Sequence, residues 1–187
     1  MVERVNTPDA LVIERCRRWV ETVIVGLIFC PFAKPVVEAG RLDYVVVNEH
    51  LFEPCLMALG EELQRLSELP AIESSLLIYP TGFESFDDYL ELVAIADALI
   101  EDQGYEGVFQ LASFHPDYCF EGQREDDAAN YTNRSPYPIL HILREDSVEK
   151  ALESFPNPDS IPVKNIAFAR AQGLEKMRAL LDACRQN

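Results

Sequence analysis

The sequence is poor in basic residues: it carries 16 Lys and Arg against 32 Asp and Glu, a formal net charge of -16. Such a field repels phosphate backbones and anionic lipid headgroups, so we expect neither nucleic acid nor a membrane surface as a partner. Long hydrophobic runs are also missing, since the longest, Val23 to Phe29, is too short to span a bilayer. The first ten residues are polar, unlike a secretory signal. We therefore expect an acidic, soluble, cytoplasmic protein.

Two further absences narrow the chemistry. The five cysteines form no Cys-x-x-Cys pair, so neither a zinc knuckle nor a disulfide framework is indicated. No Gly-x-Gly-x-x-Gly fingerprint is present, which argues against a dinucleotide or flavin. The sequence thus identifies no cofactor, and hydrolysis or group transfer is favoured over redox chemistry.

What is present fits one globular domain over residues 1–187, because a chain of this length with 48% apolar residues can bury a sizeable core. Helical spacing and β-branched runs predict the order α-β-α-β-α-β-loop-β-α-α. The four expected strands are residues 43–50, 74–80, 107–113 and 139–145. This order predicts an α/β fold with a mainly parallel sheet of about four strands, flanked by helices and with an antiparallel last strand. A ferredoxin-like α+β sandwich is the alternative.

The segment "SFHPDYCFEGQREDDAANYTNRSPYP", residues 113–138, is the least ordinary part of the chain. It is longer than most connections and dense in polar and aromatic side chains, as functional loops are. In a parallel sheet, ligands bind beyond the carboxyl ends of the strands. We therefore expect this loop to cap a site at that edge of the sheet, unless it is an Ω-loop whose polar side chains bond their own backbone.

Within that loop we assign roles by chemistry. His115 is the candidate general acid or base, and Asp117, two residues later, is the candidate group that orients its imidazole. Arg134 has a planar cation that suits an anionic substrate, unless it pairs with a neighbouring Asp. The other candidate substrate-binding residues are Asn130, Thr132, Asn133 and Tyr137.

Three further residue groups carry separate expectations. Cys30 follows an expected helix C-terminus, where the dipole disfavours a thiolate, so it is a candidate catalytic thiol only if His115 lies nearby. His141 lies within the apolar run "ILHILRE" and is expected in the core. Asp126 and Asp127 could join His115 and Asp117 around a divalent metal, although no spaced ligand motif supports a metal site.

Four blocks carry a resemblance to a known family: "GLIFCPFA", "HPDYCF", "DDAANYTNRSPYPILHILREDSVEKAL" and "IPVKNI". They resemble the signature blocks of a bacterial family catalogued as domain of unknown function family 1415, and the resemblance covers nearly the whole chain. It implies a shared fold and no established activity, cofactor or substrate. In members of that family an Asn commonly precedes an "LCPFA" block, whereas here Ile28 and Phe29 lead into Cys30.

The leading functional hypothesis is an enzyme of hydrolase or transferase type. It would act on a small polar or anionic metabolite by general acid-base chemistry through His115, Asp117 and Arg134. The first alternative is a non-catalytic module that binds a partner protein or forms a homo-oligomer. The second alternative is a protein that binds a divalent metal.

Overall fold

The sheet is the centre of the fold, seen in a computed structural model that describes residues 7–153 and 155–186. Its strands are β1 (Leu42–Val46), β2 (Ser74–Ile78), β3 (Phe109–Phe114) and β4 (Ile139–Arg144), in the order β1-β2-β4-β3. The α/β fold and the antiparallel last strand are confirmed. One detail differs from the expectation: β4 lies between β2 and β3 and is antiparallel to both, so only β1 and β2 form a parallel pair.

The central place of β4 follows from its sequence. Ile139, Leu140 and Ile142 are all fully buried, so the strand is apolar on both faces of the sheet. A strand of that kind is covered on both sides, whereas edge strands tolerate polar residues. The apolar segment that follows the long loop therefore pairs between β2 and β3 instead of forming an edge strand of the sheet.

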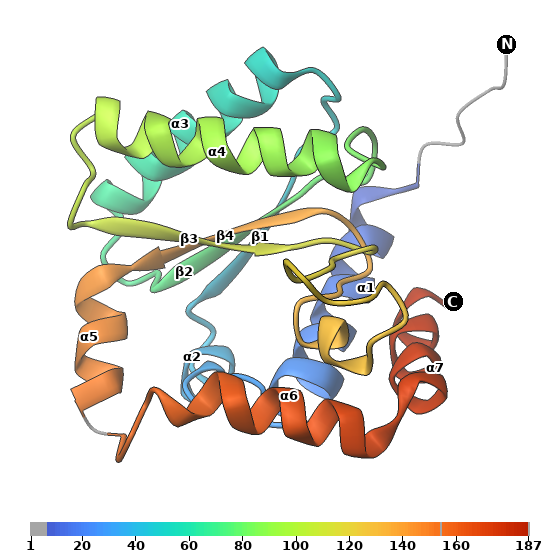
Figure 1. The fold of residues 1–187 in the computed structure, drawn as a ribbon. Helices are drawn as coiled ribbons and strands as arrows, with labels where there is room; N and C mark the ends of the chain where they lie inside the picture. The colour runs from blue at the N-terminus through green and yellow to red at the C-terminus, as the bar shows by residue number, and fades with distance from the viewer. Residues whose placement is uncertain (1–6, 154, 187) are drawn as a thin grey trace, which may run out of the picture.

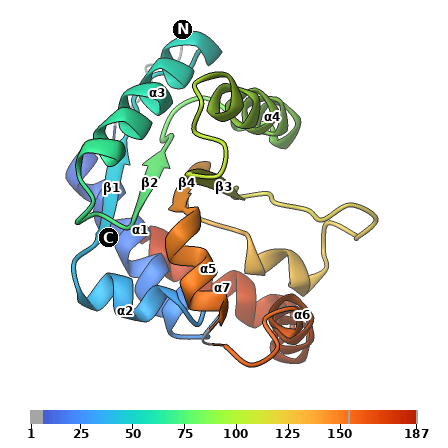
Figure 2. The ribbon, with the colours of Figure 1, turned by 90° about the vertical axis from the view of Figure 1, so that its left-hand side faces the viewer.

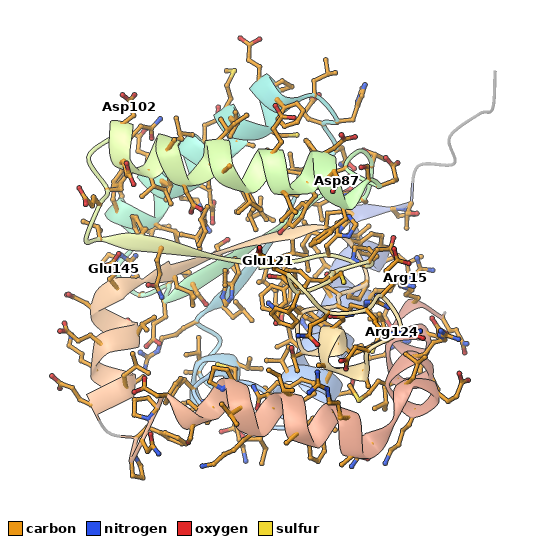
Figure 3. All side chains as sticks on the ribbon, in the orientation of Figure 1. Arg15, Asp87, Asp102, Glu121, Arg124 and Glu145 are labelled. Carbon is orange, nitrogen blue, oxygen red and sulfur yellow. The ribbon has the colours of Figure 1, made fainter. Side chains whose placement is uncertain are left out.

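Helices cover the sheet on both faces (Figure 1). One face is covered by α3 (Phe52–Glu68) and α4 (Phe86–Asp102), and Figure 3 shows the acidic residues Asp87 and Asp102 at the two ends of α4. The opposite face is covered by α1 (Asp9–Trp19), the π-helical segment η1 (Val20–Val25), α2 (Ala33–Glu38), α5 (Glu145–Glu153), α6 (Ser160–Gln172) and α7 (Leu174–Arg185). In the described part of the chain, no helix combines the length and the apolar character that a bilayer crossing would require.

The two faces are packed differently. Beneath α3 and α4, Leu59, Leu63, Leu77, Leu92 and Leu140 are completely inaccessible to solvent and form a continuous core. On the other face a second core surrounds α1 and α7, but it does not extend under α5, none of whose described residues is buried. The sheet is thus fully covered on one side and partly open on the other.

Several helices depart from the sequence expectation for local reasons. The first helix continues after Trp19 as η1, in which the Gly26 N–H bonds to the Glu21 carbonyl five residues back. Pro35 does not prevent α2, because it lies in the first turn, where its missing N–H is not needed. The expected order ends in two helices after the fourth strand, whereas the described residues form three, because α6 and α7 are divided by Gly173, whose φ of +85° favours glycine.

The long loop leaves the sheet after Phe114 and returns to it at Ile139, and these two residues face each other in the β3–β4 register. It contains the 3-10 helix η2 (Ala128–Thr132), which begins where the Asp127 carboxylate accepts the Ala129 N–H. The loop packs η2 against α6 and α7 (Figure 2). It therefore folds toward the partly open face of the sheet.

Candidate functional site

A cavity of about 840 Å³ lies on the partly open face of the sheet, between the strands and the helices α2, α5 and α6. Leu76, Ala112 and His141 form its floor, one from each of the strands β2, β3 and β4. The same three residues are register partners, so they lie side by side across the sheet. The cavity therefore opens over the middle of the sheet and not beyond the carboxyl ends of its strands.

The helices around the cavity direct apolar residues toward it without filling it. The described residues of α2 and α5 include none that is buried, although Val36 and Val37 of α2 and Val148 and Ala151 of α5 line the cavity. Phe32 and Phe155 meet edge to face, with ring centroids 5.5 Å apart, at the same wall. These side chains are half-buried because they face an internal space, which is the arrangement of a preformed ligand pocket.

His141 is the ionisable side chain on the floor of this cavity. Its residue surface is half-buried because the ring borders the cavity, but its Nε2 atom is shielded from solvent and has no hydrogen-bond partner. Burial lowers the pKa of this imidazole to about 4. His141 is thus neutral at physiological pH, and it borders a cavity where the sequence predicts packing in the core.

Cys30 lies on the cavity wall, directly before Pro31 and Phe32. It follows η1 and a sharp turn in which Ile28 has a φ of +59°, an unusual value for a β-branched residue. Burial raises the pKa of the Cys30 thiol, and the backbone N–H groups of Phe32 and Ala33 offset only part of that effect. The thiol therefore stays protonated at neutral pH. Burial is a cause of this in addition to the helix dipole considered from the sequence.

Thr132 and Asn133, two of the expected substrate-binding residues, also line the cavity. The Asn133 amide donates to the Ser113 carbonyl at 3.2 Å and its oxygen accepts from the Thr132 hydroxyl at 3.1 Å. On the opposite wall, the Asn165 amide donates to the Phe29 carbonyl at 2.6 Å. These bonds fix the end of the loop and α6 against the rest of the fold.

His115 and Asp117 lie elsewhere. His115 is completely buried on the α4 side of the sheet, where its ring packs against Phe86 and Tyr89. Its Nε2 is 2.9 Å from the Phe83 carbonyl and its Nδ1 accepts the Asp117 N–H at 3.0 Å. Burial lowers the pKa of His115, and both ring nitrogens are engaged by backbone. Neither His115 nor Asp117 lines the cavity, so Cys30 is separated from the base expected to activate it.

The remaining loop candidates bond mainly to the loop itself. Asn130 is completely buried: its oxygen accepts the Phe120 N–H and its amide donates to the Arg124 carbonyl. Arg134 donates to the carbonyls of Tyr118 and Glu125 and lies over the Tyr131 ring. The Tyr137 hydroxyl accepts from Arg15 at 2.9 Å. None of Asn130, Arg134 and Tyr137 lines the cavity. The bonds of Asn130 and Arg134 are those of the Ω-loop alternative, whereas the Tyr137 hydroxyl bonds to α1.

The acidic residues of the loop form ion pairs. Asp127 pairs with Arg170 of α6, which lowers the pKa of the carboxyl group, and Asp126 pairs with Arg124 in the same way. Over residues 7–153 and 155–186, no three His, Cys, Asp or Glu side chains come together in a way that could hold a metal ion.

Comparison with known families identifies the chain. A family model with the description "Protein of unknown function (DUF1415)" matches residues 11–179. The chain belongs to the DUF1415 family. No curated protein and no solved structure matches it.

The DUF1415 blocks noted in the sequence come together at the cavity. The first contributes Cys30, Pro31, Phe32 and Ala33, and the second contributes Phe120. The long third block contributes Thr132, Asn133 and His141, and the last contributes Asn165. These segments are far apart in the chain. Sequence reasoning placed the site at the loop because the loop has the most polar residues. The signal for the cavity was weaker, namely a histidine in phase with Ile139 and Leu143 on one face of β4.

Proposed function

We propose that this DUF1415 protein binds a small organic molecule in the cavity between the sheet and α2, α5 and α6. One observation carries the proposal: the cavity has a volume of about 840 Å³, within the range of small-molecule sites, and residues from all four blocks noted in the sequence line it. The residues that line an empty cavity of this size lack the dispersion contacts that they would make in a packed core. A bound molecule would restore them.

The lining favours a largely apolar ligand over the anionic metabolite that the loop suggested. Arg144 is the one cationic residue among the described residues that line the cavity. Its guanidinium group already donates to the carbonyls of Ile72, Leu66 and Leu69 and lies over Phe109. A carboxylate or phosphate would therefore be buried without a free cation, which is costly.

Binding has more support than catalysis. A general base works best when its pKa is close to the working pH, and burial holds the pKa of His141 at about 4. The Cys30 thiol is protonated for a related reason. The cavity gives less support to the other hypotheses than to ligand binding. Hydrolase or transferase activity stays a prediction, and so does the alternative of an interaction or oligomerisation module.

The proposal is tested with a substitution that partly fills the cavity from its floor. Ala112→Leu adds three carbon atoms beside His141, and the matched control Ala98→Leu makes the same change on the exposed surface of α4. Nile red, an uncharged dye that fluoresces in apolar surroundings, reports occupancy. We expect the unmodified protein and Ala98→Leu to bind the dye, and Ala112→Leu to bind it at least tenfold more weakly while unfolding at a higher temperature.

Two results would contradict the proposal. One is an absence of dye fluorescence with the unmodified protein. The other is equal dye affinity for Ala112→Leu and Ala98→Leu, which would place the dye on exposed apolar surface.

A further inference from the structure

The floor of the cavity contains one polar group in an otherwise apolar setting. His141 extends from the middle of β4, and its register partners Leu76 and Ala112 flank it on the two neighbouring strands. Phe114 lies near it on the same face, with ring centroids 6.3 Å apart. A ligand that covers the floor must therefore pack against this imidazole.

Four other polar side chains at the cavity have hydrogen-bond partners within the protein. The Thr132 hydroxyl donates to the Ala129 carbonyl, the Asn133 and Asn165 amides donate to backbone carbonyls, and Arg144 donates to three. Among the described residues that line the cavity, only His141 has a buried side-chain nitrogen without a partner. Buried polar atoms are paired in most proteins, so an unpaired one beside a cavity indicates a missing partner.

We propose that His141 is the specificity-determining residue of the cavity, and that it selects an uncharged ligand with a hydroxyl or amide group on an apolar frame. This inference rests on the proposed function. A neutral imidazole both donates and accepts a hydrogen bond, so it pairs with either group. A carboxylate would need a free cation or an imidazolium as its partner, and the same loss of solvation that keeps His141 neutral opposes the burial of such an ion pair.

Three probes with one skeleton separate the parts of this claim: naphthalene, 1-naphthol and 1-naphthoate, each measured by displacement of Nile red at neutral pH. With the unmodified protein we expect 1-naphthol to displace the dye about fivefold better than naphthalene, the value of one net hydrogen bond. We expect 1-naphthoate to be the weakest of the three.

The decisive variant is His141→Leu, which keeps a similar volume and removes both ring nitrogens. We expect it to bind naphthalene at least as well as the unmodified protein, and to reduce the preference for 1-naphthol from about fivefold to about onefold. His50→Leu is the matched control, since His50 is exposed and does not line the cavity, and it should keep the full preference. The ¹⁵N resonances of the His141 ring should shift with 1-naphthol and much less with naphthalene.

The outcomes separate the two proposals. If no probe displaces the dye, or no dye binds, both the cavity function and the role of His141 are wrong. If naphthalene binds but His141→Leu keeps the preference for 1-naphthol, or 1-naphthoate binds most tightly, the role of His141 is wrong and the cavity function stands.

Discussion

Ile28 has a left-handed backbone in the turn that leads from η1 into the cavity wall, and replacing it should stabilise the protein. Its φ is +59°, and its side chain is 66% exposed. The turn is held by backbone bonds from the N–H groups of Phe29 and Cys30 to the Ile24 carbonyl. The turn geometry therefore imposes the left-handed conformation, and the Ile28 side chain adds little to compensate for it.

The expected magnitude follows from two opposing terms. A left-handed conformation costs an ordinary L-residue about 1–2 kcal/mol, and Asn much less, because its short polar side chain bonds locally. The buried third of Ile28 contributes about 0.5–1 kcal/mol, a third of the value for full burial. Ile28→Asn should therefore raise the free energy of unfolding by about 0.5–1 kcal/mol. Ile28→Gly should gain less, because glycine loses more backbone entropy on folding.

Urea unfolding of each variant measures this effect, provided that the slope of free energy against urea is unchanged. Val163→Asn is a matched control, since Val163 is 67% exposed but lies within α6 with a helical backbone. It should be neutral or slightly destabilising. The reasoning would be refuted if Ile28→Asn were no more stable than the unmodified protein, or if Val163→Asn gained as much.

Four further predictions concern the interior and the loop. Burial lowers the pKa of His141 from 6.5 to about 4, so the unfolded chain takes up the proton first as the pH falls. The free energy of unfolding should therefore fall by about 3 kcal/mol between pH 6.5 and pH 4. The difference in unfolding free energy between the unmodified protein and His141→Leu, plotted against pH, should be flat above pH 6.5. His115→Phe should cost about 2–4 kcal/mol in urea unfolding, because the Phe83 carbonyl and the Asp117 N–H lose their partner, while Nile red affinity of the folded protein stays unchanged. Asn130→Ala should also lower the unfolding midpoint without changing the preference for 1-naphthol, since Asn130 bonds only within the loop. Asp127→Ala should be about 1 kcal/mol less stable than Asp127→Asn, because only Ala removes the acceptor for the Ala129 N–H; equal stabilities would show that the cap contributes nothing.

The fold was predictable where local patterns are strong. The strand cores around Leu76 and Ile142 and the cap at Ser85, whose hydroxyl accepts the Asp88 N–H, follow from period and spacing. The insertion of β4 between β2 and β3 was not predicted, because it depends on which strand best tolerates burial on both faces. The break at Gly173 was missed because apolar periodicity continues across it.

The candidate site was less predictable, and the reason is physical. Polar residues such as Arg134 and Asn130 attract attention in a sequence, but a long loop has many backbone groups to satisfy, and these side chains satisfy them. A cavity leaves almost no trace in the sequence, because its lining is made of the same apolar residues as a packed core. Thr132 and Asn133 were identified among the loop candidates, yet the floor that they adjoin was not.

The contrast between the two faces of β4 is the strongest reason to regard the cavity as a feature with a use. Leu140 and Ile142 point into a core that is packed without exposure, so this strand can be covered completely by α3 and α4. On the other face, His141 leaves a buried nitrogen unpaired, and an unfilled cavity lies between the strands and α5, none of whose described residues is buried. Both features lower stability, and both would be removed by single substitutions, His141→Leu and Ala112→Leu. A sequence selected for stability alone would have such residues, whereas proteins commonly give up stability at the sites where they bind ligands. Both substitutions should therefore raise the unfolding temperature, while Ala112→Leu weakens Nile red binding and His141→Leu removes the preference for 1-naphthol. This opposition between stability and ligand binding distinguishes a binding cavity from loose packing.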